Sequence, residues 1–227
     1  MSEPAITREQ ALLAAQAAGL DVDRPLREQV GADPADDVHA RLAEMSERLD
    51  RLISDLLVLS RLEAADLPLD VVAVDVVDLV RSAGDAWAAR CAPDGPLLRV
   101  QLPTEPIMVA TDPGRIRQVI DGLCENALRV VPAGAPLVLA AHAGHDAAVI
   151  EVRDGGPGFT DDDLRVAFDR GALNRRYRGI RKVGSGLGLA LAARLVARLG
   201  GRISAGHAPE GGAMFTVELP YATRTLP

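Results

Sequence analysis

The chain has 227 residues, of which 48% are hydrophobic, and its formal net charge is −7. This length and apolar content suit one large or two small folded domains, and the acidic balance argues against a dedicated nucleic-acid binder. Cys91 and Cys124 are too few and too far apart for a metal knuckle or a disulfide framework, so we expect reduced, buried thiols. No apolar run reaches the roughly 18 residues of a membrane span and no signal-peptide pattern is present, which favours a cytoplasmic protein.

Residues 1–66 predict a helical region. Thr7 to Gln10 has the form of a capping box, and Asp33-Pro34 begins a second, longer helix. Apolar residues recur in this helix in steps of three and four, from Val38 to Leu59, and further apolar residues widen the face. Because such a face suits a bundle better than a two-stranded coil, we expect a helical hairpin that dimerises as a four-helix bundle. Packing within one chain is the alternative.

Residues 67–227 predict a helix layer on a mixed β-sheet, after a hinge at Leu67-Pro-Leu69. Residues 171–183 lack apolar periodicity and carry five basic residues, so we expect a mobile basic loop there. Thr160 is placed to cap a short acidic helix. The expected strands are 71–74, 97–102, 107–110, 137–141, 147–153, 202–206 and 214–219, and the expected longer helices are 76–89, 112–131 and the run that follows residue 188.

A glycine loop precedes the last of these helices. Gly184, Gly186 and Gly188 alternate immediately before a strongly apolar helical run. Glycine backbones can turn their amides toward one ligand, and a helix start adds unpaired N–H groups, so the pattern favours a bound phosphate. A dinucleotide fingerprint is excluded because the third glycine is missing, and a P-loop because no lysine follows. A glycine turn that only begins a helix is the alternative.

Four motifs, taken in order, resemble those of sensor histidine kinases in the GHKL ATPase superfamily, over about residues 38–220. They are Asp112-Pro-Gly-Arg-Ile-Arg-Gln-Val-Ile-Asp-Gly-Leu-Cys-Glu-Asn-Ala-Leu-Arg129 (N box), Asp154-Gly-Gly-Pro-Gly158 (D-x-G-x-G box), Ala167-Phe-Asp-Arg170 (F box) and Gly184-Ser-Gly-Leu-Gly-Leu189 (second glycine box). The resemblance implies an α+β chain: a dimerising helical hairpin over 1–66, then an α/β sandwich of the GHKL (Bergerat) ATP-binding type over 67–227. It also implies ATP and Mg²⁺ as ligands and a place in two-component signalling.

The resemblance assigns roles to particular residues. Asn126 would bind Mg²⁺ through its amide oxygen, and Arg129, one turn along, would meet phosphate oxygens. Asp154 would accept from the adenine amino group, while Gly156 and Gly158 let the base approach the backbone. An exposed helical Asn and Arg and a turn-forming Asp are the alternatives. Phe168 would anchor an ATP lid over 171–183 by packing, and the other implied nucleotide-binding residues are Arg178, Lys182, Gly184, Ser185, Gly186, Leu187, Gly188 and Thr216.

The sequence departs from the family at two places. The family's phosphoacceptor is a histidine followed by an acidic residue in the first bundle helix, and here Leu20 or Ile6 falls at that position. His39 lies on the predicted bundle helix but has no acidic neighbour after it, which makes it a poor acceptor. Gly122 stands where the family's N box has its first Asn.

Three hypotheses follow from this pattern. The first is an ATP-dependent kinase that phosphorylates a histidine on a partner kinase or phosphotransfer protein and so serves a response regulator. The second is an inactive, dimeric ATP-binding scaffold, which Gly122 and the missing acceptor favour. The third is a serine kinase of the anti-sigma type, against which the long heptad helix argues.

Overall fold

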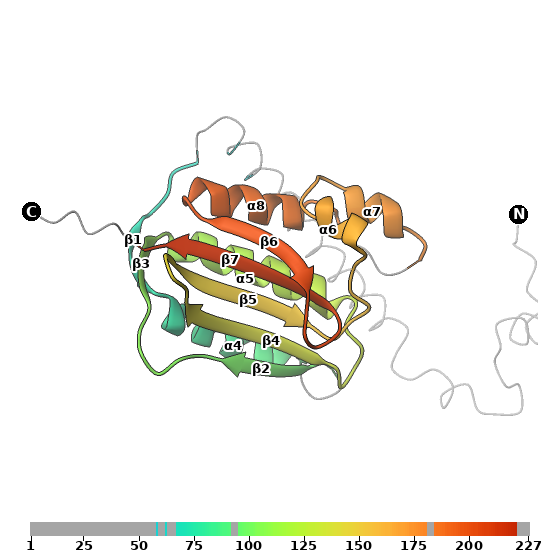
Figure 1. Cartoon of the computed structure of the whole chain (residues 1–227), viewed down its shortest axis with the longest axis horizontal. Coiled ribbons are helices and arrows are strands. Elements are labelled where there is room, and N and C mark those ends of the chain that lie inside the picture. Colours follow the sequence, from blue (N-terminus) through green and yellow to red (C-terminus); the bar gives the residue numbers. More distant parts are fainter. Residues whose placement is uncertain (1–57, 59–61, 63–66, 92–94, 181–183, 222–227) are drawn as a thin grey trace, which may run out of the picture. The chain divides into compact units, whose positions relative to one another are not determined.

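The computed structural model describes residues 58, 62, 67–91, 95–180 and 184–221 (Figure 1). The predicted helical hairpin and His39 therefore lie outside the described residues. Of the long predicted helix, Val58 and Leu62 are described; both are helical and pack, partly buried, against the core of the domain that follows.

Five strands form the main sheet, in the order β2-β4-β5-β7-β6. They are β2 (Leu97–Gln101), β4 (Pro136–Ala143), β5 (Ala147–Asp154), β6 (Arg202–His207) and β7 (Ala213–Pro220). β2 pairs with β4 in parallel, and the remaining pairs are antiparallel, which confirms the predicted mixed sheet. A separate antiparallel pair joins β1 (Val72–Asp75) to β3 (Met108–Thr111).

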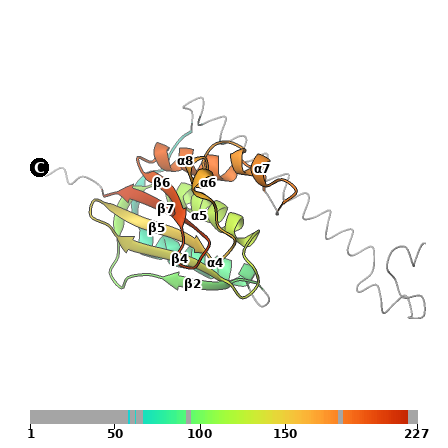
Figure 2. The same cartoon turned by 45° about the vertical axis from the view of Figure 1, so that its right-hand side comes forward.

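Three helices cover one face of the main sheet: α4 (Val76–Cys91), α5 (Pro113–Leu128) and α8 (Gly188–Arg198), as Figures 1 and 2 show. The strands present alternate residues to this layer because successive side chains point to opposite faces. In β7, Ala213, Phe215, Val217 and Leu219 are buried in the core, and the residues between them face the other way. Both cysteines are buried and free, as expected, and burial raises the pKa of the Cys124 thiol.

Helix α5 begins where the sequence predicted. Asp112 is its N-cap, with Oδ1 accepting from the Arg115 amide at 3.0 Å, and Pro113 occupies the first turn. The second carboxylate oxygen accepts from the Asp70 amide at 2.9 Å, so one buried side chain joins the hinge before β1 to the start of α5. This bond fixes the N-terminal end of α5. The C-terminal turns of the same helix carry residues of the nucleotide motifs.

Two short helices lie between β5 and α8, α6 (Asp161–Arg165) and α7 (Ala172–Tyr177). Thr160 caps α6 in a full capping box with Asp163, as predicted. The prediction of a loop throughout 171–183 is wrong for residues 172–177, which form α7. No residue of α7 is buried, so the helix carries no apolar periodicity by which the sequence could reveal it. Residues 181–183, with Lys182, lie outside the described part of the chain.

Replacing Asp112 by alanine tests the role of this cap. We expect Asp112→Ala to lower the free energy of unfolding by about 2 kcal/mol, because it removes a helix cap and leaves the Asp70 amide without its partner. Urea denaturation followed by circular dichroism measures the change. Asp146→Ala is the control, since Asp146 pairs with His145 on a fully solvated turn and its loss should cost less than about 0.5 kcal/mol. Equal effects of the two substitutions would contradict the assignment.

Candidate nucleotide site

Helix α5, the end of β5 and the start of β7 enclose a pocket at one edge of the sheet. It contains three of the residues singled out from the sequence, Asn126, Asp154 and Gly158. The full lining is Asn126, Ala127, Val130, Asp154, Gly158, Phe159, Ala213 and Phe215. Most of this lining is apolar, with one carboxylate and one amide, which is the composition expected for a site that receives a flat heterocycle.

Asp154 is the last residue of β5 and is 4% exposed. Its Oδ1 accepts from the Gly156 amide at 2.8 Å and from the Ala213 amide at 3.3 Å. Its main-chain carbonyl accepts from the Gly212 amide at 3.0 Å. A carboxylate has about four acceptor positions, so these bonds orient the group and still allow it to accept from an exocyclic amine.

Glycines surround this carboxylate because side chains would not fit. A Cβ at Gly156 would lie 2.9 Å from Asp154 Oδ1, and Gly158 has a φ of 64°, a conformation that other residues resist. A Cβ at Gly212 would overlap both Oδ1 and the carbonyl oxygen of Asp154. Gly212 lies outside the four sequence motifs, and its role depends on a contact that only the folded sheet creates.

The β6–β7 turn that carries Gly212 is also held from the opposite face of the sheet. Arg153 Nη2 lies 3.2 Å from Glu210 Oε1 in this turn, and both side chains are largely buried. Because Arg153 precedes Asp154 in β5, its side chain points to the other face. The ion pair therefore braces the turn behind the pocket, a role that no local sequence pattern predicted.

Asn126 and Arg129 lie on α5 against the glycine loop. A Cβ at Gly188 would lie 3.9 Å from Asn126 Nδ2, and a Cβ at Gly184 would overlap the Arg129 guanidinium. Arg129 is held by Glu125, with 3.6 Å between Nη2 and Oε2. The structure thus brings together Asn126, Arg129 and the glycine loop, the residues that the family resemblance assigns to Mg²⁺ and the phosphates.

The glycine loop exposes backbone groups at the start of α8. Gly186 has a φ of 76°, and the Leu187 amide donates to Ser185 Oγ at 3.2 Å. Helix α8 has no side-chain hydrogen bond at its N-cap. Amides at a helix start that lack a side-chain cap are suited to an anion.

Magnesium is the metal that the family resemblance implies, and Asn126 is the residue to test for it. Its Nδ2 atom is buried and has no hydrogen-bond partner among the described residues, which is costly unless a polar ligand completes the group. A rotation of the amide aims its oxygen the same way, and amide oxygen suits Mg²⁺. No group of three or more His, Cys, Asp or Glu able to hold a metal occurs among the described residues. Mg²⁺ commonly takes one or two protein ligands together with phosphates and water.

The other predicted residues lie around this site or away from it. The Phe168 ring packs edge-on against Phe215, with 6.3 Å between centroids, in agreement with a packing role. Arg178 is exposed and donates to Asn174 Oδ1 at 3.1 Å. Thr216 is not brought to the pocket, because it alternates with the core residues Phe215 and Val217 and faces the opposite side of the sheet.

These features define an α+β ATP-binding sandwich of the GHKL type. The model of the family "Histidine kinase-, DNA gyrase B-, and HSP90-like ATPase" matches residues 111–223. The ATP-binding domain of PrrB from Mycobacterium tuberculosis has a TM-score of 0.53 at 28% identity, over 68% of this chain and 99% of that one. Full-length ShkA, solved in complex with AMPPNP, has a TM-score of 0.71 at 28% identity, over 89% of this chain and 42% of that one.

Curated relatives agree with this fold. The histidine-protein kinase BaeS of Escherichia coli is 36% identical over 76% of this chain and 37% of its own length. The sensor histidine kinase component HK1 of Mycobacterium tuberculosis is 40% identical over 50% of this chain and 66% of its own length. The chain belongs to the sensor histidine kinase family and carries the ATP-binding domain of that family. It spans between a third and a half of the length of BaeS and of another matched M. tuberculosis kinase. Among its described helices, none is long and apolar enough to cross a membrane.

Replacing Gly212 by alanine tests the constraint at Asp154. We expect Gly212→Ala to weaken ATP binding at least about tenfold, because its Cβ would displace the carboxylate and so disturb a charge-assisted hydrogen bond. Isothermal titration calorimetry measures the affinity.

Gly122→Ala is the matched control for folding in this experiment. No atom of the described residues lies within 4 Å of a Cβ there, so this change in a helix interior should raise the free energy of unfolding by about 0.5–1 kcal/mol. Unchanged ATP affinity in Gly212→Ala would show that Asp154 tolerates the shift.

Proposed function

We propose that this chain is an ATP-dependent protein-histidine kinase of a two-component system that phosphorylates a histidine on a partner chain. One observation carries the proposal. Asn126, Arg129 and the glycine loop face one another beside the pocket of Asp154, whereas the described histidines lie elsewhere. This arrangement supports a donor site within this chain, and the proposal takes the acceptor histidine from a partner chain.

The histidines of the chain support an external acceptor. His142, His145 and His207 are exposed, and each lies near a carboxylate, of Glu151, Asp146 and Asp161 respectively. His145 is followed by an acidic residue, but it lies in the β4–β5 turn. That turn is at the opposite end of the eight-residue strand β5 from Asp154, a separation of about 25 Å. His39, outside the described residues, is followed by Ala40 and lacks an acidic neighbour.

In this proposal the residues of the site position ATP and neutralise its charge. Asp154 accepts from the adenine amino group while the glycines at 156 and 158 let the base approach. Asn126 holds Mg²⁺, which supplies positive charge to the phosphate oxygens. Arg129 and the backbone of the glycine loop bind the phosphates. Transfer of the γ-phosphoryl group from ATP to an imidazole nitrogen, with ADP as the leaving group, then requires mainly alignment and charge neutralisation.

The partners are inferred from the same logic. A homodimer formed through residues 1–66 would present its helical region to a second, histidine-bearing protein, which would then pass the phosphoryl group to a response regulator. The name of HK1, a sensor histidine kinase component, is compatible with kinases whose parts are distributed over several chains.

Phosphotransfer from labelled ATP tests the proposal. The chain is incubated with [γ-³²P]ATP, Mg²⁺ and histidine-bearing proteins of two-component systems. We expect acid-labile label on one partner, and Asp154→Ala and Asn126→Ala should each reduce the labelling by at least about a hundredfold, since each removes a charged or metal contact.

Other patterns of label would contradict the proposal. Acid-stable label on a partner serine would identify a serine kinase. Label on this chain that His39→Gln abolishes would place the acceptor within it. A complete absence of label would exclude kinase activity.

An ATP-binding scaffold without turnover is the second candidate, and Gly122 is the observation that favours it. The position lies within α5, three residues before Glu125, and no described atom lies within 4 Å of a Cβ there. The Cβ of an asparagine therefore meets open space. We expect the wild-type chain to transfer phosphate already; calorimetric ATP binding without transfer, rescued by Gly122→Asn, would identify the scaffold instead.

A further inference from the structure

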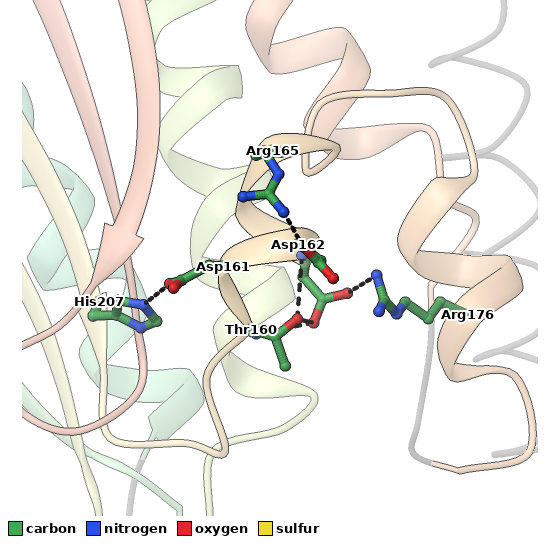
Figure 3. A network of polar contacts seen from close by, with 7 residues as sticks. Thr160, Asp161, Asp162, Arg165, Arg176 and His207 are labelled. Atoms are coloured by element: carbon green, nitrogen blue, oxygen red, sulfur yellow. Dashed lines mark hydrogen bonds and ion pairs between the residues drawn. The ribbon is translucent and has the colours of Figure 1, made fainter.

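Asp163 is a buried carboxylate that the nucleotide site does not explain. Among the described residues, three carboxylates are buried: Asp112, which caps α5, Asp154, which lines the pocket, and Asp163 in α6. The Oδ2 atom of Asp163 accepts from the Thr160 amide at 2.9 Å, from Thr160 Oγ1 at 2.8 Å and from the Tyr177 hydroxyl. Arg176 Nη1 lies 3.1 Å from Oδ1 (Figure 3).

These partners fall into two groups. The Thr160 bonds belong to the capping box and would hold α6 together if the carboxylate were solvated. Tyr177 and Arg176 come from α7, so they bind Asp163 only when α7 lies against α6. Burial raises the pKa of Asp163, but hydrogen bonds from Tyr177 and Thr160 and the charge of Arg176 outweigh it and hold the pKa below its ordinary value. A buried, ionised group of this kind strongly favours the arrangement that supplies its partners.

The start of α7 contacts the glycine loop. The Gly171 amide, at the N-cap of α7, donates to the Gly186 carbonyl at 2.9 Å. Asn174 Nδ2 donates to the Gly184 carbonyl at 2.5 Å. Six residues separate Gly171 from Tyr177, about 9 Å along a helix. Helix α7 is therefore a short strut between Asp163 and the loop that faces Asn126 and Arg129.

We propose that Asp163 and Tyr177 form a latch that positions the glycine loop for the phosphates of ATP. The latch rests on the proposed function, because it acts through the loop that would bind the triphosphate. Neither Asp163 nor Tyr177 is among the residues that line the nucleotide pocket, and we treat both as positioning residues.

Helix α6 and the segment before it, which carry Asp163, are attached to the main sheet independently of the Tyr177 hydroxyl. The Phe159 ring packs against Tyr177 and against Phe215, with centroid distances of 6.4 and 6.3 Å. His207, at the end of β6, lies 2.9 Å from Asp161 at the start of α6. Removal of the Tyr177 hydroxyl therefore leaves the ring packing and the attachment of α6 in place, which makes Tyr177→Phe a specific test.

The test compares ATP with adenosine on the full-length chain. ATP affinity is measured by calorimetry in the presence of Mg²⁺, and adenosine affinity by chemical-shift titration. Because adenosine lacks the phosphates that the glycine loop would bind, we expect Tyr177→Phe to weaken ATP about tenfold and to leave adenosine unchanged. Asp163→Asn should weaken ATP similarly, since the amide is a poorer acceptor for Tyr177 and Arg176.

Two matched controls are available. Tyr221→Phe removes a hydroxyl that donates to the Gly144 carbonyl, and Asp162→Asn removes an exposed carboxylate paired with Arg165 in the same helix. Both should bind ATP as the wild type does. Wild-type ATP affinity in Tyr177→Phe would overturn the latch and leave the proposed function intact. Equal weakening of ATP and adenosine would overturn it too, by showing a general structural role. A wild-type chain that binds no ATP would overturn the proposed function and the latch with it.

Discussion

The end of the domain that carries the nucleotide pocket depends on the close packing of Asp154 against backbone amide groups. Its side chain and carbonyl together accept from three amides, those of Gly156, Gly212 and Ala213. Two of these donors, Gly212 at the end of the β6–β7 turn and Ala213 at the start of β7, lie more than fifty residues further along the chain. The approach is so close that position 212 cannot carry a Cβ. The carboxylate therefore owes its orientation to the closure of the sheet as well as to the local turn in which it lies.

Features that depend on neighbouring residues could be predicted from the sequence, whereas features that depend on contacts between distant segments could not. The start of α5 was predictable because Asp112 and Pro113 act within one helical turn, and the strands because their apolar residues alternate. Gly212 and the Arg153–Glu210 ion pair were not, because they depend on contacts between segments that only the folded sheet brings together. The face of Thr216 depends on strand register, and a single residue of register reverses it.

Helix α7 shows a second reason why a structural element can be missed by prediction from sequence. Prediction from apolar periodicity assumes that an element packs by burying a hydrophobic face. This helix is held by polar groups, from Gly171 and Asn174 at one end and from Arg176 and Tyr177 at the other. The basic composition of the segment indicated its charge correctly, but gave no sign that some of that charge serves to hold a helix in place.

Because α7 buries no residue, its attachment and the stability of the domain have separate physical origins. Detaching α7 exposes little apolar surface, and polar contacts of this kind contribute only about 1–3 kcal/mol each. Local opening of this segment is therefore far more frequent than global unfolding, and amide exchange in α7 should follow the local event. Core substitutions that raise the melting temperature would leave that opening rate unchanged. Under the proposed latch, thermal tolerance and the speed of ATP exchange can thus vary independently in this chain.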